Sequence, residues 1–248
     1  MKTLELPAVV LVASAMCPTI ASAQCEQVPV LADGRAYIVD STVTPTHAWF
    51  YVLQGRSYSI EVTPPDGVTG VTPFVAVISD SVNCPTTTSA AGVVNTSVTE
   101  PRVNQGARWS IIGTSPSLVA MRMRVVGQRF KVVVADTTLF NSSWSTVGGF
   151  GTQWGLQNTT GSTITGTLTV QESFGGSATY TRSVSLPANS TTFVMSSDQL
   201  GGATIPSGRG GSATFTHLGP PGSVQGDAFL IGVNMIVPAI FRTMRDGR

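Results

Sequence analysis

The stretch Ser57-Tyr58-Ser59-Ile60-Glu61-Val62-Thr63 decides the fold class of this chain. Its apolar residues alternate with polar ones, so Tyr58, Ile60 and Val62 share one face of an extended segment. Alternation with a period of two is typical of a β-strand that has one buried and one wet face. The next four residues, Pro64-Pro65-Asp66-Gly67, predict a turn, because these residue types favour chain reversal.

Strand-like runs continue on both sides of this stretch. They are rich in Val, Thr, Ile and aromatic residues and are separated by clusters of Gly, Pro, Asn and Ser. The charged fraction is 11%, under half of the roughly 25% that is usual in soluble domains, so little helix is expected. Further strands are predicted at residues 36–39, 47–53, 74–78, 108–112, 118–126, 129–135, 153–157, 164–171, 178–186, 191–195, 212–217, 227–231 and 233–241.

Gly127 and Gln128 connect the predicted strands 118–126 and 129–135. Two connecting residues with glycine first are typical of a tight hairpin, so we expect these strands to pair. Positions 121–124 alternate methionine with arginine. This pattern favours a solvated sheet face, or an edge protected by charge, over a basic stripe that faces a ligand.

Residues 1–23 have the layout of a cleaved signal peptide. Lys2 is followed by a short apolar run, and Ala21-Ser22-Ala23 fits a cleavage site that would leave Gln24 as the mature N-terminus. The apolar run is shorter than the about 20 residues that span a bilayer, and we expect no membrane span in the mature chain. The protein is therefore expected to be secreted or periplasmic.

The length of the mature chain suits two domains of ordinary size or one large β domain. After Asp136 the sequence becomes richer in Ser, Thr and Gly, and short strands then resume. The sequence predicts an all-β chain of two β-sandwich domains, jelly-roll or immunoglobulin-like, at residues 24–135 and 136–248.

Three cysteines are present, and Cys17 lies in the signal peptide. Cys25 and Cys84 remain as an even pair in an oxidising compartment, which predicts a disulfide. Two cysteines without CxxC spacing and two distant histidines do not suggest a metal site, and no cofactor is expected.

His47 and His217 are the only histidines, and no serine-elbow, zinc-protease or nucleotide-binding motif accompanies them. We expect His47 to be a partly buried residue of an edge strand. His217 precedes a Gly-Pro-Pro-Gly loop; it could act as a base or ligand, but a structural role in holding that turn is favoured. The chain is therefore predicted not to be an enzyme, and a secreted hydrolase with His217 as its base is the weakest alternative.

Tryptophans offer a possible binding surface. Trp144 and Trp154 flank a Gly-rich segment, and Trp109 lies in an earlier strand. Exposed rings of this kind could stack on sugars, although filling the core or an interface is favoured for such residues.

The segments 47–52 and 55–62 resemble the bacterial pre-peptidase C-terminal domain, over residues 30 to 135. Both have an aromatic strand, a Gly turn and a Tyr-x-hydrophobic-x-Val strand. The resemblance implies a jelly-roll-like sandwich that accompanies secreted enzymes or stands alone on exported proteins. This chain lacks the acidic run often seen between the early strands of that family, which argues against calcium binding.

The segments 136–141, 156–160 and 217–222 are similar to an uncharacterised module of bacterial exported proteins, which implies no chemistry. The net charge of +1 and the lack of a basic run argue against binding to nucleic acid.

The leading hypothesis is an exported, non-catalytic binding or structural protein of the bacterial envelope or exterior. A polysaccharide or a cell-surface protein is the expected partner. The main alternative is a carbohydrate-binding module that uses Trp109, Trp144 and Trp154.

Overall fold

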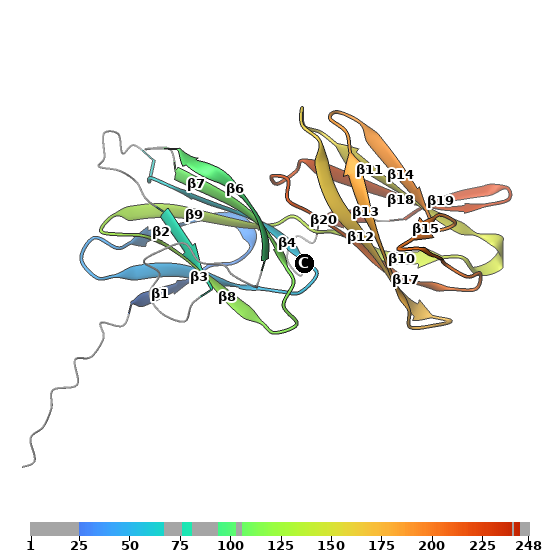
Figure 1. Cartoon of the computed structure of the whole chain (residues 1–248), viewed down its shortest axis with the longest axis horizontal. Coiled ribbons are helices and arrows are strands. Elements are labelled where there is room, and N and C mark those ends of the chain that lie inside the picture. The colour runs from blue at the N-terminus through green and yellow to red at the C-terminus, as the bar shows by residue number, and fades with distance from the viewer. Residues whose placement is uncertain (1–24, 67–75, 81–93, 103–105, 240, 244–248) are drawn as a thin grey trace, which may run out of the picture.

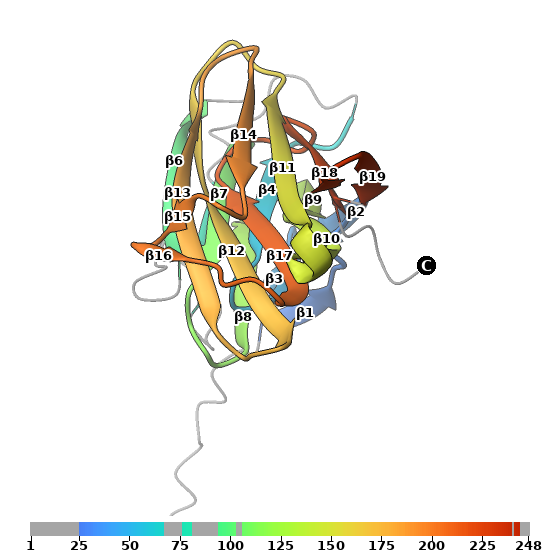
Figure 2. The same ribbon diagram turned by 90° about the vertical axis from the view of Figure 1, so that its right-hand side faces the viewer.

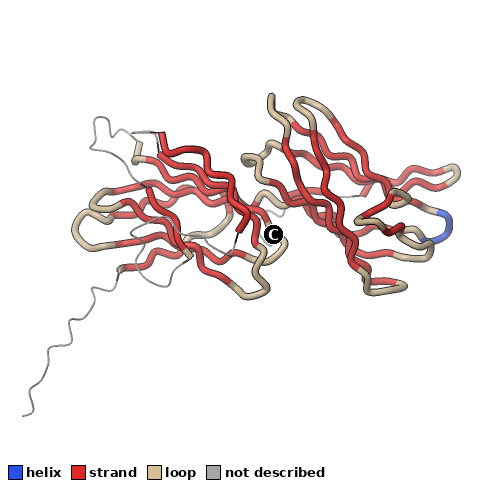
Figure 3. Tube along the Cα trace, in the orientation of Figure 1, coloured by secondary structure: helices blue, strands red, loops and turns tan. Residues whose placement is uncertain are grey.

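The computed structural model describes residues 25–66, 76–80, 94–102, 106–239 and 241–243. Within these residues the chain is built from strands, and the one helical element is a 3-10 turn, η1, at Val147–Gly149. Figure 3 shows this turn in blue beside the red strands. The prediction of an all-β fold with packed sheets is confirmed.

The N-terminal half, strands β1 to β9, contains two sheets (Figure 1). Their inward side chains form one hydrophobic core that includes Phe50, Ile60, Met121 and Val132. The four-stranded sheet has the order β1 (Glu26–Pro29), β3 (Thr46–Val52), β8 (Val119–Val125), β5 (Ala76–Ser79). The five-stranded sheet has the order β2 (Asp33–Asp40), β9 (Arg129–Asp136), β4 (Ser57–Thr63), β7 (Gly106–Gly113), β6 (Val94–Arg102).

The predicted hairpin between β8 and β9 is wrong. β8 pairs with β3 and β5, whereas β9 pairs with β2 and β4. Gly127, with φ of 66°, and Gln128 therefore carry the chain from one sheet to the other. A short glycine turn suits a change of layer as well as a hairpin, so the turn residues alone did not distinguish the two.

The arginines of β8 are also placed differently from the prediction. β8 lies inside its sheet, between β3 and β5, so it is not an edge strand. Arg124 is 8% exposed and Arg122 is half-buried, so this face is not solvated either.

The expected wet face of β4 is wrong at two positions. Ser57 and Ser59 are buried, and only Glu61 and Thr63 are partly exposed on that face. β4 lies between β9 and β7, and Ser57 is enclosed by the segment that leads into the C-terminal half.

The C-terminal half, strands β10 to β20, repeats the two-sheet arrangement, and its layers are seen from the end in Figure 2. One sheet has the order β13 (Thr179–Leu186), β12 (Ile164–Phe174), β17 (Gly210–His217), β10 (Leu139–Ser145), β20 (Phe241–Thr243). The other has the order β14 (Thr191–Met195), β11 (Gly151–Asn158), β18 (Val224–Gly232), β19 (Met235–Ala239), and β15 (Gln199–Leu200) pairs with β16 (Ala203–Thr204).

The buried hydrophobic side chains form two clusters. One is drawn from strands that precede Asp136, and the other from strands that follow it. The strand pairings of the described residues likewise join strands on the same side of Asp136. The division of the chain into two domains at Asp136 stays a prediction.

Two predictions lie outside the described residues. The signal peptide at residues 1–23 is one of them. The Cys25–Cys84 disulfide is the other, because Cys84 is not described; Cys25 itself is buried directly before β1.

Candidate functional site

The three tryptophans considered for sugar stacking are buried. Trp109 on β7 is 3% exposed, Trp144 on β10 is 2% exposed and Trp154 on β11 is 0% exposed. Trp109 belongs to the core of the N-terminal half, whereas the other two belong to the core of the C-terminal half. The alternative of a binding surface made of these three exposed rings is therefore wrong.

The indole N–H groups explain why two of these rings can be buried. The Trp144 Nε1 donates to the carbonyls of Gln171 at 3.2 Å and Ser212 at 3.0 Å. The Trp154 Nε1 donates to the Asn141 Oδ1 at 3.2 Å. A buried indole that finds an acceptor loses little on leaving water, so these side chains act as core residues.

His217, at the end of β17, is also enclosed. It is 1% exposed, its Nδ1 accepts the Gly219 N–H at 3.1 Å, and it shares a backbone hydrogen bond with Thr137. Burial lowers the pKa of His217 from 6.5 to about 4, against the opposing effect of the Thr137 bond. The ring is therefore neutral at neutral pH and fixed in place, which suits the predicted role of holding the turn better than ligand binding.

His47 differs from its prediction in position and burial. It lies on β3 between β1 and β8, not on an edge strand, and it is 1% exposed. Neither ring nitrogen has a hydrogen-bond partner among the residues that the structure describes. Burial and the nearby charges of Arg122 and Arg124 lower the pKa of His47 to about 4. The ring is neutral at neutral pH and is closed off from solvent.

The two halves meet at a polar junction around the segment 136–138. Asp136 accepts a hydrogen bond from Arg56 at 2.8 Å and one from the Thr138 N–H at 2.9 Å. Ser57 accepts both the Thr137 N–H, at 2.8 Å, and the Thr137 hydroxyl, at 3.0 Å. The Ser57 N–H in turn donates to the Thr138 Oγ1 at 2.9 Å. Asp136 is therefore bound to Arg56, which directly precedes β4, and Thr137 and Thr138 are bound to Ser57, the first residue of β4.

His217 extends this network into the C-terminal half. Its bond with Thr137 connects the end of β17 to the connecting segment. The side chain of Thr137 is buried on the other side against Ser57. Thr137 is thus hydrogen-bonded to residues of both halves, so the junction is a specific contact between them.

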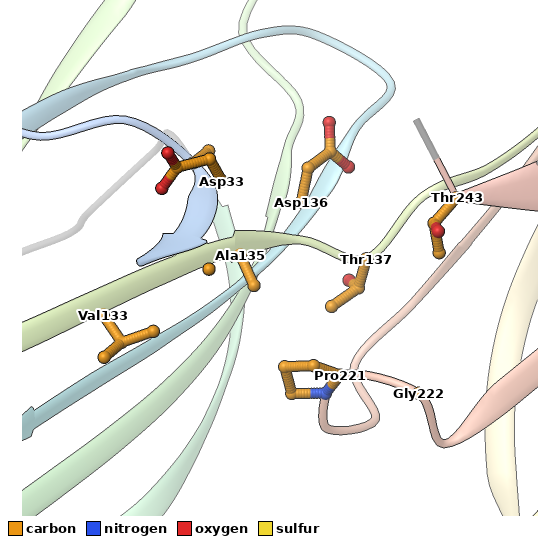
Figure 4. A pocket seen from close by; sticks show the side chains of 10 residues that line it. Asp33, Val133, Ala135, Asp136, Thr137, Pro221, Gly222 and Thr243 are labelled. Atoms are coloured by element: carbon orange, nitrogen blue, oxygen red, sulfur yellow. The ribbon is translucent and has the colours of Figure 1, made fainter. Parts of the chain in front are cut away.

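A cavity of about 410 Å³ opens at this junction. Figure 4 shows Thr137 between Asp33 and Asp136, which come from the N-terminal half, and Pro221, Gly222 and Thr243, which come from the C-terminal half. Ligand pockets are typically about 300–1,000 Å³ and are often found between domains. The cavity therefore has the size and the location of a small-ligand site.

The carboxylates that line the cavity are largely buried. The side chains of Asp33 and Asp136 are 4% and 8% exposed, respectively. Arg35 bonds to Asp33 through its backbone N–H, at 2.9 Å, and its Nε, at 3.3 Å. Each carboxylate is thus paired with an arginine and keeps acceptor capacity for further donors. The lining suits a neutral ligand that carries hydroxyl groups.

A second hollow, of about 280 Å³, lies beside β1 and β3. Trp49 and Tyr51 lie on its rim, with ring centroids 4.9 Å apart at an interplanar angle of 83°. Tyr51 is 50% exposed and Trp49 is half-buried. Both rings stand in an apolar strand that is typical of a core, so the sequence did not mark the pair as a surface feature. Their alternation with the buried Ala48, Phe50 and Val52 was the available signal.

Among the described residues no three His, Cys, Asp or Glu side chains gather as they would around a metal ion. In the same part of the chain no helix is long and apolar enough to cross a membrane.

No family model, curated protein or solved structure matches this chain. The resemblance to the pre-peptidase C-terminal domain stays a prediction.

Proposed function

We propose that this protein is an exported, non-catalytic binding protein that holds a neutral, hydroxyl-rich ligand, such as a sugar unit of a polysaccharide, in the junction cavity. The observation that carries the proposal is the cavity itself, which lies between the two halves and is lined by two largely buried carboxylates and two threonines. Carboxylate and hydroxyl oxygens accept hydrogen bonds from sugar hydroxyls, and the apolar wall formed by Val133 and Pro221 suits the C–H face of a sugar ring.

The state of the histidines argues against either one as a general base in the junction cavity. General acid–base chemistry needs a titratable group within hydrogen-bond reach of the substrate and with a pKa near the working pH. His47 and His217 are both enclosed, and burial lowers the pKa of each to about 4. Neither ring lines the junction cavity.

Isothermal titration calorimetry with neutral oligosaccharides of glucose, mannose and N-acetylglucosamine tests this proposal. Thr243→Trp places a large side chain in the cavity and should weaken binding at least about tenfold. Thr165→Trp, at an exposed position of β12, is the matched control and should leave binding unchanged. Equal effects of the two substitutions, or no binding of any oligosaccharide, would refute the proposal.

A second candidate for the sugar site is the rim formed by Trp49 and Tyr51, because Tyr51 is half exposed beside a hollow. Stacking on an aromatic ring is a common way to bind a sugar face. In the same titrations, Tyr51→Ala would abolish binding and Thr243→Trp would leave it intact if the ligand stacks on this rim.

A further inference from the structure

The end of β18, the following turn and β19 form an uncharged hairpin. Residues 228–241 contain no charged side chain, and Asn234 in the turn is their one strongly polar residue. Only 11% of the residues of this chain are charged, so uncharged runs are common in it, and this run is notable because it is exposed. Figure 1 shows this hairpin beside η1, at the end of the C-terminal half that is remote from the N-terminal half.

The apolar side chains of this hairpin face solvent. Val233 is 93% exposed, Ile236 is 68% exposed and Met235 is 55% exposed. β19 is the edge strand of its sheet and is exposed over nearly its whole length. Adjacent exposed apolar residues of this kind usually mark a contact surface.

We propose that the tip of this hairpin, residues 233–237, inserts into the interfacial region of a lipid bilayer. Apolar side chains carried on an amphipathic surface enter the headgroup and acyl boundary to a depth of about 5–10 Å. A projecting two-stranded hairpin reaches that depth with its tip while the body of the sandwich stays in water. The backbone of β19 is paired with β18 along one side, so few polar backbone groups of the tip would have to leave water.

The size of the surface argues against a second copy of the chain as the occupant. A stable protein–protein interface buries about 800 Å² on each partner, from about 20–30 residues. The exposed tip offers four large apolar side chains, those of Val233, Met235, Ile236 and Val237. Shallow insertion into lipid needs only a few such side chains, because the burial of each apolar side chain is favourable by itself.

The open edge of β19 also argues against strand addition. The turn of two residues makes Gly232 and Met235 a hydrogen-bonded pair, so alternate residues of β19, Ile236 and Pro238, direct their backbone groups to the open edge. Pro238 has no N–H to donate there. Proline on an edge strand prevents pairing with another chain, so the edge is protected while its side chains remain available.

The base of the hairpin is held by an aromatic side chain. A Cβ at Gly232 would come within 2.8 Å of the Phe150 ring, so this ring packs directly against the hairpin backbone. Val147, in η1, is 40% exposed. Apolar side chains therefore lie next to the start of the hairpin turn. Because residues 228–241 carry no basic side chain, insertion needs no attraction to anionic lipid and should occur in uncharged phosphatidylcholine bilayers.

Quenching by brominated lipid tests the proposal at the site itself. Ile236→Trp places a reporter at the tip, where Ile236 is 68% exposed, and Val43→Trp places one at a valine of the N-terminal half that is 93% exposed. With the exported protein and vesicles of brominated phosphatidylcholine, the emission added by Ile236→Trp should be quenched. The emission added by Val43→Trp should be unchanged. The pair reports insertion of the tip even if another part of the chain also contacts lipid.

Vesicle flotation gives the second readout. Ile236→Glu should lower the fraction bound to phosphatidylcholine vesicles at least about tenfold, whereas Val43→Glu should leave it unchanged. Thermal melts identify folded variants, and Val233→Asp replaces Ile236→Glu if the latter does not fold. An unquenched Ile236→Trp, or equal losses for the tip and control variants, overturns the proposal. A wild-type dimer that Ile236→Glu dissociates in sedimentation velocity also overturns it, in favour of a second copy.

Discussion

Lowering the pH should destabilise this protein at pH values above those at which carboxylates titrate, because the folded chain buries two neutral histidines. Burial lowers the pKa of His47 and His217 from 6.5 to about 4, and in His47 the charges of Arg122 and Arg124 add to the effect. Protonation of His217 would place a proton on the Nδ1 atom toward which the Gly219 N–H points. The two histidines therefore bind protons more weakly in the folded state than in the unfolded state.

The direction and size of the effect follow from linkage. A histidine whose folded pKa is depressed contributes its full stability above the unfolded pKa of 6.5 and loses it progressively as the pH falls toward 4. From pH 7 to pH 5 the loss is about 2 kcal/mol for each histidine, or about 4 kcal/mol for the pair. Asp40 has a lowered pKa caused first by its hydrogen bond with the Thr42 side chain, so its contribution is lost at lower pH.

Urea denaturation at pH 7 and pH 5, with the wild type and with a variant that lacks the His217 ring, measures the change in unfolding free energy directly. His217→Gln should reduce the loss of unfolding free energy between the two pH values to about 2 kcal/mol, because only His47 would remain. The variant can be less stable at both pH values without affecting this difference. Wild-type stability that is the same at pH 7 and pH 5, or a loss that His217→Gln leaves undiminished, would refute the reasoning.

Three further predictions concern the junction, a close backbone approach in the C-terminal half and the N-terminus. Asp136→Ala should lower the unfolding free energy by about 2 kcal/mol in urea denaturation, since it removes two hydrogen bonds from a largely buried carboxylate. Glu61→Ala, which breaks the exposed pair with Arg108, should cost under about 1 kcal/mol, and equal costs would contradict the junction argument. Gly211→Ala should lower the melting temperature, with a cost of about 1–3 kcal/mol, because a Cβ there would overlap the Gln171 carbonyl. Gly161→Ala, in open space, should be within about 0.5 kcal/mol of the wild type. Exported protein should begin at Gln24 by intact mass and show no free thiol at Cys25 or Cys84; labelling of both cysteines would exclude the bridge, which is worth about 4 kcal/mol in the chain-entropy model.

Local patterns in the sequence predicted strands but not their partners. The alternation of Tyr58, Ile60 and Val62 predicted a strand with the same bounds as β4, because side-chain period and backbone geometry are linked residue by residue. The separation of β8 from β9 into different sheets depends on packing between layers, and Gly127 permits either outcome.

The candidate site was harder to predict because its parts are distant in the sequence. The junction cavity combines residues 32–34, 133, 135–137, 221–222 and 243, and no single local pattern of the sequence brings these residues together. The tryptophans show the same limit. Trp144 is buried because acceptors at Gln171 and Ser212 reach its indole N–H, and no local pattern around it encodes those partners.

Ligand binding and stability should respond to acid at different pH values, and this difference would separate a junction site from a general effect of unfolding. Stability begins to fall near pH 6.5, because the unfolded chain takes up protons there. The folded chain keeps His217 neutral until the pH approaches its pKa of about 4, so its bond with Thr137 and the cavity beside it should be intact at pH 5. Oligosaccharide affinity should therefore be nearly the same at pH 7 and pH 5 for protein that is still folded, although the urea midpoint has fallen. An affinity that declines in parallel with stability over this range would show that the junction opens before His217 is protonated, and the cavity could not then be the preformed site proposed.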